Sequence, residues 1–452
     1  MTATPTDRHR LLRPLGPLLA VALLLLLFWA GAMRNSRLVN TDPKKSDQGS
    51  YIEYAIKLAE TDRQWVGNRN QMPLVPALYS FFYRPEMDQR TFFETGKRLN
   101  ILFTMGVCLL LAALYLRLFP PHAALNLALI TAFCHLIFRA PYFKAEVPYY
   151  FLITLAFLAG AYAVRRCELR WAAAFGLLCA LAHYCKASTQ PILAVFVAVL
   201  AARQILAFRG ARDASAPPPR RRWMPSLCIL ATLAVFLGLL APYLIQSKRV
   251  YGRYFYNVNS TFYVWYDSWQ EVKRGTRAAG DRVGWPKLPP DQIPSARKYF
   301  REHTPGQIAG RLLKGAALQT KNLIGAHGSF KYLLLAALCA GTLAWQHRRE
   351  LRARLAPVAW PILFAVGYVG LTFAATAWYS PLADGSRFVM ALYLPLLVCG
   401  FWLVTRLPDA TVRIAGRPAS VATTFQRVVT LILLIEIPFN LIVRLADEFG
   451  GA

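Results

Sequence analysis

The feature that most constrains this chain is a series of long segments without a charged residue. A helix needs about 20 apolar residues to cross the hydrocarbon core of a bilayer. Segments of about that length are Pro14–Met33, Leu99–Leu116, Leu118–Phe138, Val147–Val164, Trp223–Ser247, Leu355–Ala383 and Phe388–Thr405. Charged residues are only 17% of the chain, against roughly 25% in ordinary soluble domains. The pattern excludes a string of soluble domains and predicts an all-α polytopic membrane protein.

Four shorter or interrupted apolar segments complete the expected set. They are Trp171–Cys185, Ala187–Phe208, Tyr332–His347 and Val428–Val443. Arg203 interrupts the second of these, and Glu436 and Pro438 lie in the last one. We therefore expect about 11 transmembrane helices.

Basic residues in the short loops set the expected orientation. The net charge is +29, and arginines cluster in alternate short segments, at Arg8–Arg13, Arg165–Arg170, Arg220–Arg222 and Arg348–Arg354. The short loops on the other side carry only Arg139, Lys144, Lys186 and Arg387. Because short cytoplasmic loops are enriched in Lys and Arg, the pattern predicts a cytoplasmic N-terminus. It also explains the charge without a nucleic-acid partner, so we expect none.

The first apolar segment has two interpretations. Arg8–Arg13, a leucine run and Ala30–Ala32 fit a cleaved signal peptide. Twenty uncharged residues favour a retained anchor.

These patterns divide the chain into five regions. We expect an N-terminal tail and first span (1–33), a first outer loop (34–98), spans 2–7 (99–247) with a flexible basic linker (209–222), a second outer loop (248–331) and spans 8–11 (332–452). Both long loops carry aromatic residues and helical patterns, so we expect helices at the membrane surface in each.

Acidic residues concentrate in the first outer loop, where Asp47 is the main candidate for chemistry. Ser50 and Glu53 have the spacing of a capping box, which predicts a helix with Asp47 just before its first turn. The positive end of the helix dipole favours an ionised carboxylate there. A general base and a simple helix cap both fit these observations.

Other polar residues are expected at the same membrane face. Glu146 begins a span beside Lys144 and Arg139, which could be its ion-pair partners. Lys186 lies between two short spans, and Arg387 opens a late span after Asp384. Arg69 lies in the proline-bearing segment 68–76 of the first outer loop.

The second outer loop is basic and begins with a dense aromatic tract between Tyr251 and Trp269. Such aromatics suit the headgroup layer and also suit stacking on sugar rings. Asn259-Ser260-Thr261 matches a glycosylation triplet. No zinc or disulfide spacing is visible among the eight cysteines, and the sequence indicates no particular metal site or cofactor.

The order of these features resembles the C-type-fold (GT-C) glycosyltransferases, in particular the group of protein O-mannosyltransferases and the lipid A aminoarabinose transferase. The motifs that carry the resemblance are Ser46–Tyr51 with Ala55, Pro73 and Pro76 behind it, Glu146 at a span entry, Lys186-Ala-Ser, and Ser386-Arg387-Phe388. Gln48 stands where the family often has a second acid, and Glu146 where an aspartate is common.

The resemblance implies transfer of a sugar, a hexose or pentose, from a polyprenyl-phosphate donor to a hydroxyl of a glycan, lipid or protein acceptor. The transfer would be an inverting direct displacement on the outer, periplasmic face of a bacterial inner membrane. It implies Asp47 as the base, Glu146 as an orienting or tuning acid, and Lys186 and Arg387 on the phosphate. Arg69 and Arg139 are weaker phosphate candidates.

Two other classes of function compete with a transferase. A transporter or flippase of lipid-linked saccharides would also be polytopic with cations at the rim. It predicts charges deep within the spans, where Arg203 and Glu436 are the main examples. A scaffold without chemistry leaves the acids of the first outer loop unexplained.

Overall fold

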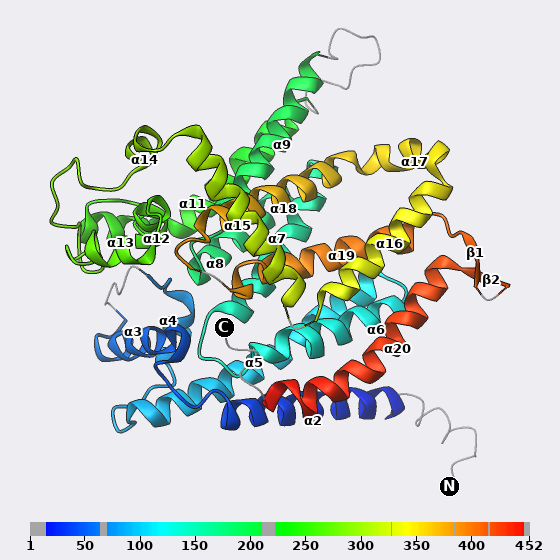
Figure 1. The fold of residues 1–452 in the computed structure, drawn as a ribbon, viewed down its shortest axis with the longest axis horizontal. Helices are drawn as coiled ribbons and strands as arrows, with labels where there is room; N and C mark the ends of the chain where they lie inside the picture. Colours follow the sequence, from blue (N-terminus) through cyan, green and yellow to red (C-terminus); the bar gives the residue numbers. More distant parts are fainter. Residues whose placement is uncertain are drawn as a thin grey trace, which may run out of the picture.

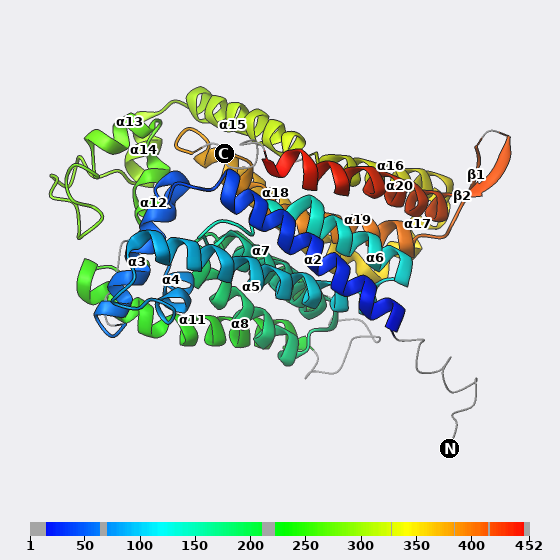
Figure 2. The same ribbon diagram turned by 90° about the horizontal axis from the view of Figure 1, so that it is seen from below.

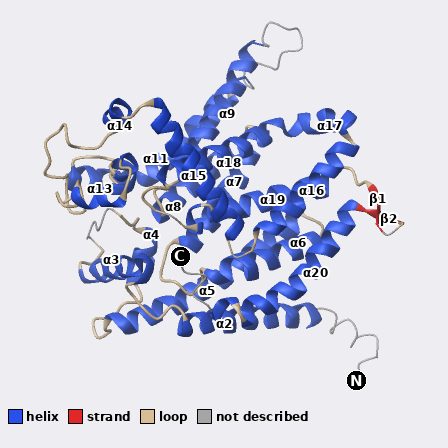
Figure 3. Ribbon diagram, viewed as in Figure 1, coloured by secondary structure: helices blue, strands red, loops and turns tan. Residues whose placement is uncertain are grey.

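The computed structural model describes residues 15–63, 70–209, 222–326, 328–383, 385–414 and 416–446. Within these ranges the protein is almost entirely helical (Figure 3). Within the described ranges eight helices are long and apolar enough to cross a membrane, or nine if the bent pair Pro305–Gly325 and Phe330–Gln346 counts as one span. Two shorter apolar helices, Leu169–Cys185 and Met390–Arg406, lie where two further spans were predicted. The prediction of an all-α polytopic membrane protein is confirmed.

The spanning helices follow the chain in the predicted order. They are α2 (Leu15–Leu38), α5 (Gln89–Leu118), α6 (Pro121–Leu129), α7 (Glu146–Arg166), α8 (Leu169–Cys185), α9 (Gln190–Arg209), α11 (Met224–Tyr251), α16 (Phe330–Gln346), α18 (Ala359–Tyr379), α19 (Met390–Arg406) and α20 (Val421–Ile442). The third span is not uniform, because α6 continues into a π-helical turn at Ile130–His135 and a 3₁₀ turn at Leu136–Phe138.

The two long loops contain further helices, which lie at one end of the molecule (Figures 1 and 2). In the first loop these are a 3₁₀ turn η1 (Lys45–Asp47), α3 (Gln48–Glu60) and α4 (Leu74–Ser80). In the second they are α12 (Val258–Thr261), η5 (Tyr263–Trp265), α13 (Trp269–Arg274), α14 (Ala296–Glu302) and α15 (Pro305–Gly325). The opposite end carries α17 (Arg348–Leu355), η6 (Ala356–Val358) and the start of α2.

One element was not expected. An antiparallel hairpin of β1 (Thr411–Ile414) and β2 (Arg417–Ser420) connects α19 to α20 and pairs Thr411 with Ser420. Gly416 has a φ of 78° in its turn, a conformation that glycine adopts without strain. The hairpin lies at the end of the molecule opposite the two long loops (Figure 1).

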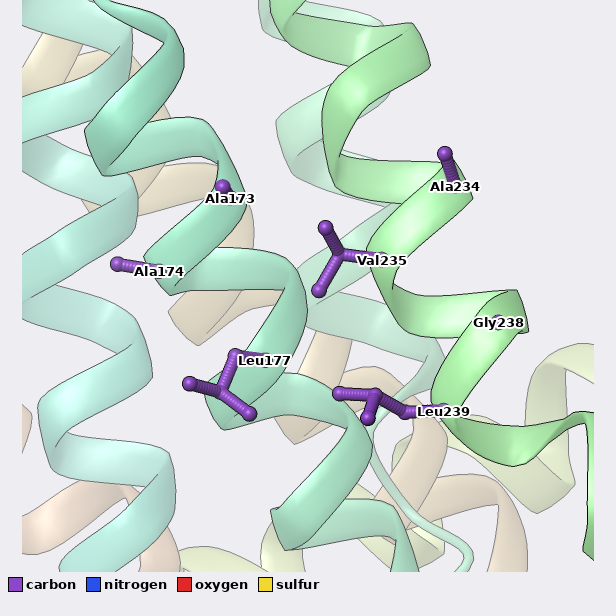
Figure 4. Close-up of a pocket in the computed structure, with 7 residues that line it drawn as sticks. All are labelled: Ala173, Ala174, Leu177, Ala234, Val235, Gly238 and Leu239. Carbon is purple, nitrogen blue, oxygen red and sulfur yellow. The ribbon is translucent and has the colours of Figure 1, made fainter.

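Small side chains allow the spans to approach closely. Between α8 and α11 they leave a shallow apolar groove of about 530 Å³, lined by Ala173, Ala174, Leu177, Ala234, Val235, Gly238 and Leu239 (Figure 4). Deeper along the same interface a Cβ on Gly176 would lie 2.6 Å from the Thr232 carbonyl oxygen. Close backbone contact of this kind is how membrane helices pack without a hydrophobic driving force between them.

The charges that lie within spans are satisfied by partners. Glu436 of α20 is buried and forms ion pairs with Lys331 (2.6 Å) and Arg444 (3.4 Å). Arg203 of α9 donates to the carbonyl oxygens of Val164 and Arg165. Pairing of this kind makes charged groups tolerable at membrane depth.

The first and last helices are tied together. Arg34 at the end of α2 donates to the carbonyl oxygens of Leu441 (3.0 Å) and Ile442 (2.8 Å). Asn35 donates to that of Leu445 (2.9 Å), in the 3₁₀ turn η8 (Arg444–Ala446). These bonds fix the point where the first long loop leaves the bundle.

The side chain of Gln48 fixes the first loop to the segment before α7. Its Oε1 accepts from the Phe143 backbone N–H (2.9 Å) and from Asn40 Nδ2 (2.9 Å), and its Nε2 donates to Asn40 Oδ1 (2.8 Å). Asn40 in turn donates to the Pro141 carbonyl (2.6 Å). Gln48 is fully buried, so these bonds replace water on both of its polar atoms.

We predict that Gln48→Met lowers the thermal stability of the detergent-purified protein. The change leaves the Phe143 N–H and the Asn40 amide unsatisfied, at a cost of about 1–3 kcal/mol for each buried group. Gln190→Met, at an exposed glutamine, is the matched control. Equal melting temperatures for the two variants would contradict the assignment.

We also predict that Gly315→Ala destabilises the contact between α15 and α18. A Cβ at Gly315 would lie 1.9 Å from the Ala377 carbonyl oxygen, so the helices must separate, at a cost of about 1–3 kcal/mol. Gly341→Ala on α16, where a Cβ meets open space, is the control. A melting temperature equal to that of the control would show that α15 does not pack as described.

Candidate functional site

The side chain of Asp47 lies between the first loop and the late loop before α19. Asp47 is the N-cap of α3, with a left-handed φ of 69° and no side-chain cap hydrogen bond. Its Oδ2 instead accepts from Arg387 Nη1 at 2.9 Å. Non-glycine residues rarely take this backbone conformation. The carboxylate is therefore directed away from the helix end, and it remains half exposed.

The predicted start of α3 is wrong. The capping-box spacing places the cap at Ser50, but the helix begins at Gln48 and Ser50 lies inside it. The buried hydrogen bonds of Gln48 determine this start. The apolar face is as expected, with Tyr51, Ala55 and Leu58 buried.

Glu146 has a partner that its local sequence does not indicate. Its Oε1 accepts from Lys186 Nζ at 3.3 Å, across 40 positions of the chain, and not from its neighbours Lys144 or Arg139. Glu146 lies in the first turn of α7, where the helix dipole favours a carboxylate. Its Oε2 is buried and, among the described residues, has no hydrogen-bond partner.

Two further contacts connect these segments. Arg139 Nη2 donates to Ser386 Oγ (3.0 Å), and the Tyr150 hydroxyl of α7 donates to the Arg387 carbonyl oxygen (3.0 Å). Both contacts bind the short 3₁₀ turn η7 (Ser386–Phe388) to α7 and the segment before it. Together they hold the Arg387 side chain opposite Asp47.

The structure thus brings five of the six sequence-predicted residues to one place. They are Asp47, Glu146, Lys186, Arg387 and Arg139. Arg69, like Asp384, lies outside the described residues. The sequence indicated Lys144 only as a possible ion-pair partner of Glu146, and Ser386 only as part of the motif around Arg387. It gave no role to Tyr150, whose position one helical turn after Glu146 was the available signal.

Electrostatic shifts show that the charges act on one another. Burial lowers the pKa of Arg387, but Glu146 and Asp47 outweigh it and hold that pKa above its ordinary value. Burial lowers the pKa of Lys186 although Glu146 opposes the shift. Burial also lowers the pKa of Lys144 to about 8, again against Glu146. Desolvation disfavours the charged form of each of these cations.

Tyr51 lies close to both acids. Burial first, and then Glu146 and Asp47, raise the pKa of its phenol. The hydroxyl therefore stays protonated and can donate a hydrogen bond.

Within the described residues no group of three or more His, Cys, Asp or Glu could hold a metal ion.

The asparagine of the glycosylation triplet in the second loop makes hydrogen bonds within the protein. Asn259 donates to Asn70 Oδ1 (2.8 Å) and accepts from the Tyr379 hydroxyl (2.9 Å). These bonds join the two long loops and the end of α18. Both polar atoms of the Asn259 side chain are thus hydrogen-bonded, so this asparagine has a structural role.

Sequence comparisons identify no relative of this chain. No protein-family model matches it, and no curated protein sequence matches it. Structure comparison does find similar folds.

One similar structure is the archaeal oligosaccharyltransferase AglB from Archaeoglobus fulgidus in complex with an inhibitory peptide and a dolichol-phosphate. The TM-score is 0.52 at 12% identity over 95% of this chain. The match covers 56% of AglB, so this chain spans little more than half of that protein's length.

Two more distant matches are the apo oligosaccharyltransferase of Archaeoglobus fulgidus and ArnT from Cupriavidus metallidurans bound to undecaprenyl phosphate. Their TM-scores are 0.48 and 0.33, at 13% and 14% identity. They cover 94% and 85% of this chain, and 56% and 78% of their own chains. The chain therefore shares its helical fold with AglB, which confirms the predicted GT-C-like fold.

Proposed function

We propose that the protein transfers a sugar from a polyprenyl-phosphate donor to an acceptor hydroxyl at the face of the membrane that carries the two long loops. The observation that supports this most strongly is the meeting of two acid–cation pairs, Asp47 with Arg387 and Glu146 with Lys186. A displacement at an anomeric carbon needs both kinds of group: a base for the acceptor and cations for the leaving phosphate.

Asp47 is the proposed general base. In the reaction its carboxylate takes the proton of the acceptor hydroxyl while the oxygen attacks the anomeric carbon. The bond between that carbon and the phosphate oxygen breaks, and its electron pair stays on the polyprenyl phosphate. Attack from the side opposite the leaving group inverts the anomeric centre. A positioned base of this kind contributes about 10²–10⁴-fold.

Arg387 and Lys186 are the proposed phosphate ligands. The Asp47 contact occupies one amino group of the Arg387 guanidinium, and a guanidinium has five N–H donors. Arg387 can therefore hold Asp47 and a phosphate oxygen together. Cations fixed in advance beside developing charge stabilise the transition state without reorganisation. Arg139, bound to Ser386, and Arg69 are proposed in supporting roles.

Glu146 has a free carboxylate oxygen for the acceptor. Oε1 accepts from Lys186, and Oε2 has no protein partner among the residues that the structure describes. A buried acceptor atom without a partner is costly. A second hydroxyl of the acceptor would satisfy Oε2 and orient the attacking oxygen toward Asp47.

The proposed location is a bacterial inner membrane with the N-terminus in the cytoplasm. The basic segments favour this orientation, which places both long loops in the periplasm. A donor anchored by its polyprenyl chain would reach a site at this depth by diffusion in the bilayer.

We predict that Asp47→Asn abolishes transfer without reducing the amount of protein in the membrane. The amide keeps the shape but cannot accept a proton, so the rate falls about 10²–10⁴-fold. Mass spectrometry of lipid-linked saccharides and envelope glycans is the readout. One glycan should lose a single sugar while its polyprenyl-phosphate donor accumulates.

Asp62→Asn is the matched control, because Asp62 is an exposed acid of the same loop. Its profile should equal that of the wild type. If Asp47→Asn also leaves both profiles unchanged, Asp47 is not the base and a flippase of lipid-linked saccharides becomes the better hypothesis.

Lys144 interacts electrostatically with Glu146, Arg387 and Arg139, and we propose that its charge also attracts the phosphate. We predict that affinity for undecaprenyl phosphate falls as the pH rises above about 8. The pKa of Lys144 is about 8, so its ammonium is charged below that pH and neutral above it. The second ionisation of the phosphate, with a pKa of about 6, is complete by then and does not mask the effect. Titrations of the purified protein between pH 7 and 10 measure it.

Lys144→Arg keeps the charge throughout this range and should remove the fall in affinity near pH 8. Identical pH profiles for the wild type and Lys144→Arg would show that Lys144 does not contact the phosphate.

A further inference from the structure

A second cleft lies on the same face of the protein, between α15 and the turn that follows α18. Its volume is about 830 Å³, within the range of pockets that hold small-molecule ligands. Ser380 and Pro381 line it from the turn, and Asp267, Tyr299 and His303 line it from the second loop. None of these residues belongs to the acid–cation pairs of the proposed active site.

Two glycines of α15, Gly306 and Gly310, form the floor of this cleft. Close packing against a neighbouring element does not explain why these positions are glycine. Gly315 on the same helix is explained by its contact with α18, but a Cβ on Gly310 meets nothing within 4 Å, and one on Gly306 meets only Thr304 Oγ1, at 4.0 Å. Glycine in a helix costs roughly 0.5–1 kcal/mol relative to alanine. Gly306 and Gly310 lie one turn apart and line the cleft. This loss of helix stability is explained if a flat group of a ligand must approach the helix backbone at Gly306 and Gly310.

A network around Asp267 fixes the shape of the cleft. Its carboxylate accepts from the Tyr299 hydroxyl, from His303 Nε2 and from Arg311 Nη1, each at 2.8 Å. Arg311 also donates to the carbonyl oxygens of Trp378 (3.0 Å) and Val264 (3.2 Å). Asp267 accepts three hydrogen bonds and Arg311 donates three, so both residues hold the wall of the cleft in place.

The cleft carries an excess of positive charge. His303 Nδ1 lies 2.9 Å from the Tyr299 carbonyl oxygen, and Nε2 contacts the Asp267 carboxylate. Burial lowers the pKa of His303, but the hydrogen bonds to Tyr299 and Asp267 outweigh it and raise that pKa, which favours the cationic form with a proton on both ring nitrogens. His303, Arg311 and Lys314 therefore oppose the single carboxylate of Asp267. Lys314 is exposed, and no ion pair is found for it in the described part of the chain.

The cleft is adjacent to the proposed active site. α15 packs against η7, the turn that carries Arg387. Tyr379, just before the cleft turn, contacts Phe388 with ring centroids 5.9 Å apart. A ligand in the cleft therefore lies beside the loop that holds Arg387 against Asp47.

We propose that this cleft binds the acceptor, and that the acceptor is a saccharide carrying an anionic group. The assignment of an acceptor rests on the proposed transferase function; the anionic saccharide class rests on the cleft alone. A sugar ring lies on the glycine floor of α15, and its carboxylate or phosphate pairs with Lys314.

Binding to the full-length protein in nanodiscs tests the proposal. The probes are a fluorescent tetragalacturonate and the neutral maltotetraose of equal length. Gly310→Leu fills the cleft, and Lys314→Glu reverses its free charge. Ala309→Leu and Lys321→Glu make the same changes at exposed positions of α15 outside the cleft. Melting temperatures verify that each variant is folded.

The wild type and both controls should bind tetragalacturonate more tightly than maltotetraose. Each cleft variant should weaken that binding by about tenfold or more, because like charges at an interface repel and a filled cleft excludes the ring. Undecaprenyl phosphate should bind all five proteins equally.

The proposal is wrong if tetragalacturonate does not bind the wild type, if maltotetraose binds equally well, or if the cleft variants match their controls. It is also wrong if short-chain phosphatidylglycerol displaces tetragalacturonate at lower concentration, since the cleft would then be a lipid site. Loss of undecaprenyl phosphate binding in the wild type would instead contradict the proposed transferase and leave the saccharide result standing.

Discussion

The ion pair between Asp47 and Arg387 joins residues that are 340 positions apart. A charge near a bilayer is costly unless another charge or a set of hydrogen bonds compensates it. The same requirement accounts for Glu146 with Lys186, for Glu436 with Lys331 and Arg444, and for Asp267 with Arg311. The pairs Asp47–Arg387 and Glu146–Lys186 link segments that are far apart in the chain. Compensation of charge therefore also helps to hold the loops against the helices.

This requirement shapes the proposed chemistry. Without a substrate, the cations of the site hold the acids in position. An incoming phosphate offers these cations a second anionic partner, and the acids become less shielded. In the proposed reaction, Asp47 and Glu146 would thus be held in position until the donor binds.

Hydropathy predicted the helices well because the bilayer allows few alternatives to a continuous helix. The sequence also predicted that the site residues lie near one another, because the predicted topology places their loops on the same face of the membrane. The partners did not follow, because Lys186 lies 40 positions from Glu146 and only tertiary packing brings it close. The helix start at Gln48 was missed because its hydrogen bonds are to Asn40 and Phe143, not to its own helix. The hairpin at Thr411–Ser420 was missed because its strands are four residues long.

The bonds from Arg34 and Asn35 to Leu441, Ile442 and Leu445 have a consequence for biogenesis. Asp47 is translated long before Lys186 and Arg387, yet the base of its loop is anchored to the last helix. During synthesis from the N-terminus, the loop cannot reach its final position until α20 has left the ribosome and entered the membrane. The earliest residue of the site is thus among the last to be fixed. A chain truncated before α20 would expose this loop to the quality-control proteases of the membrane.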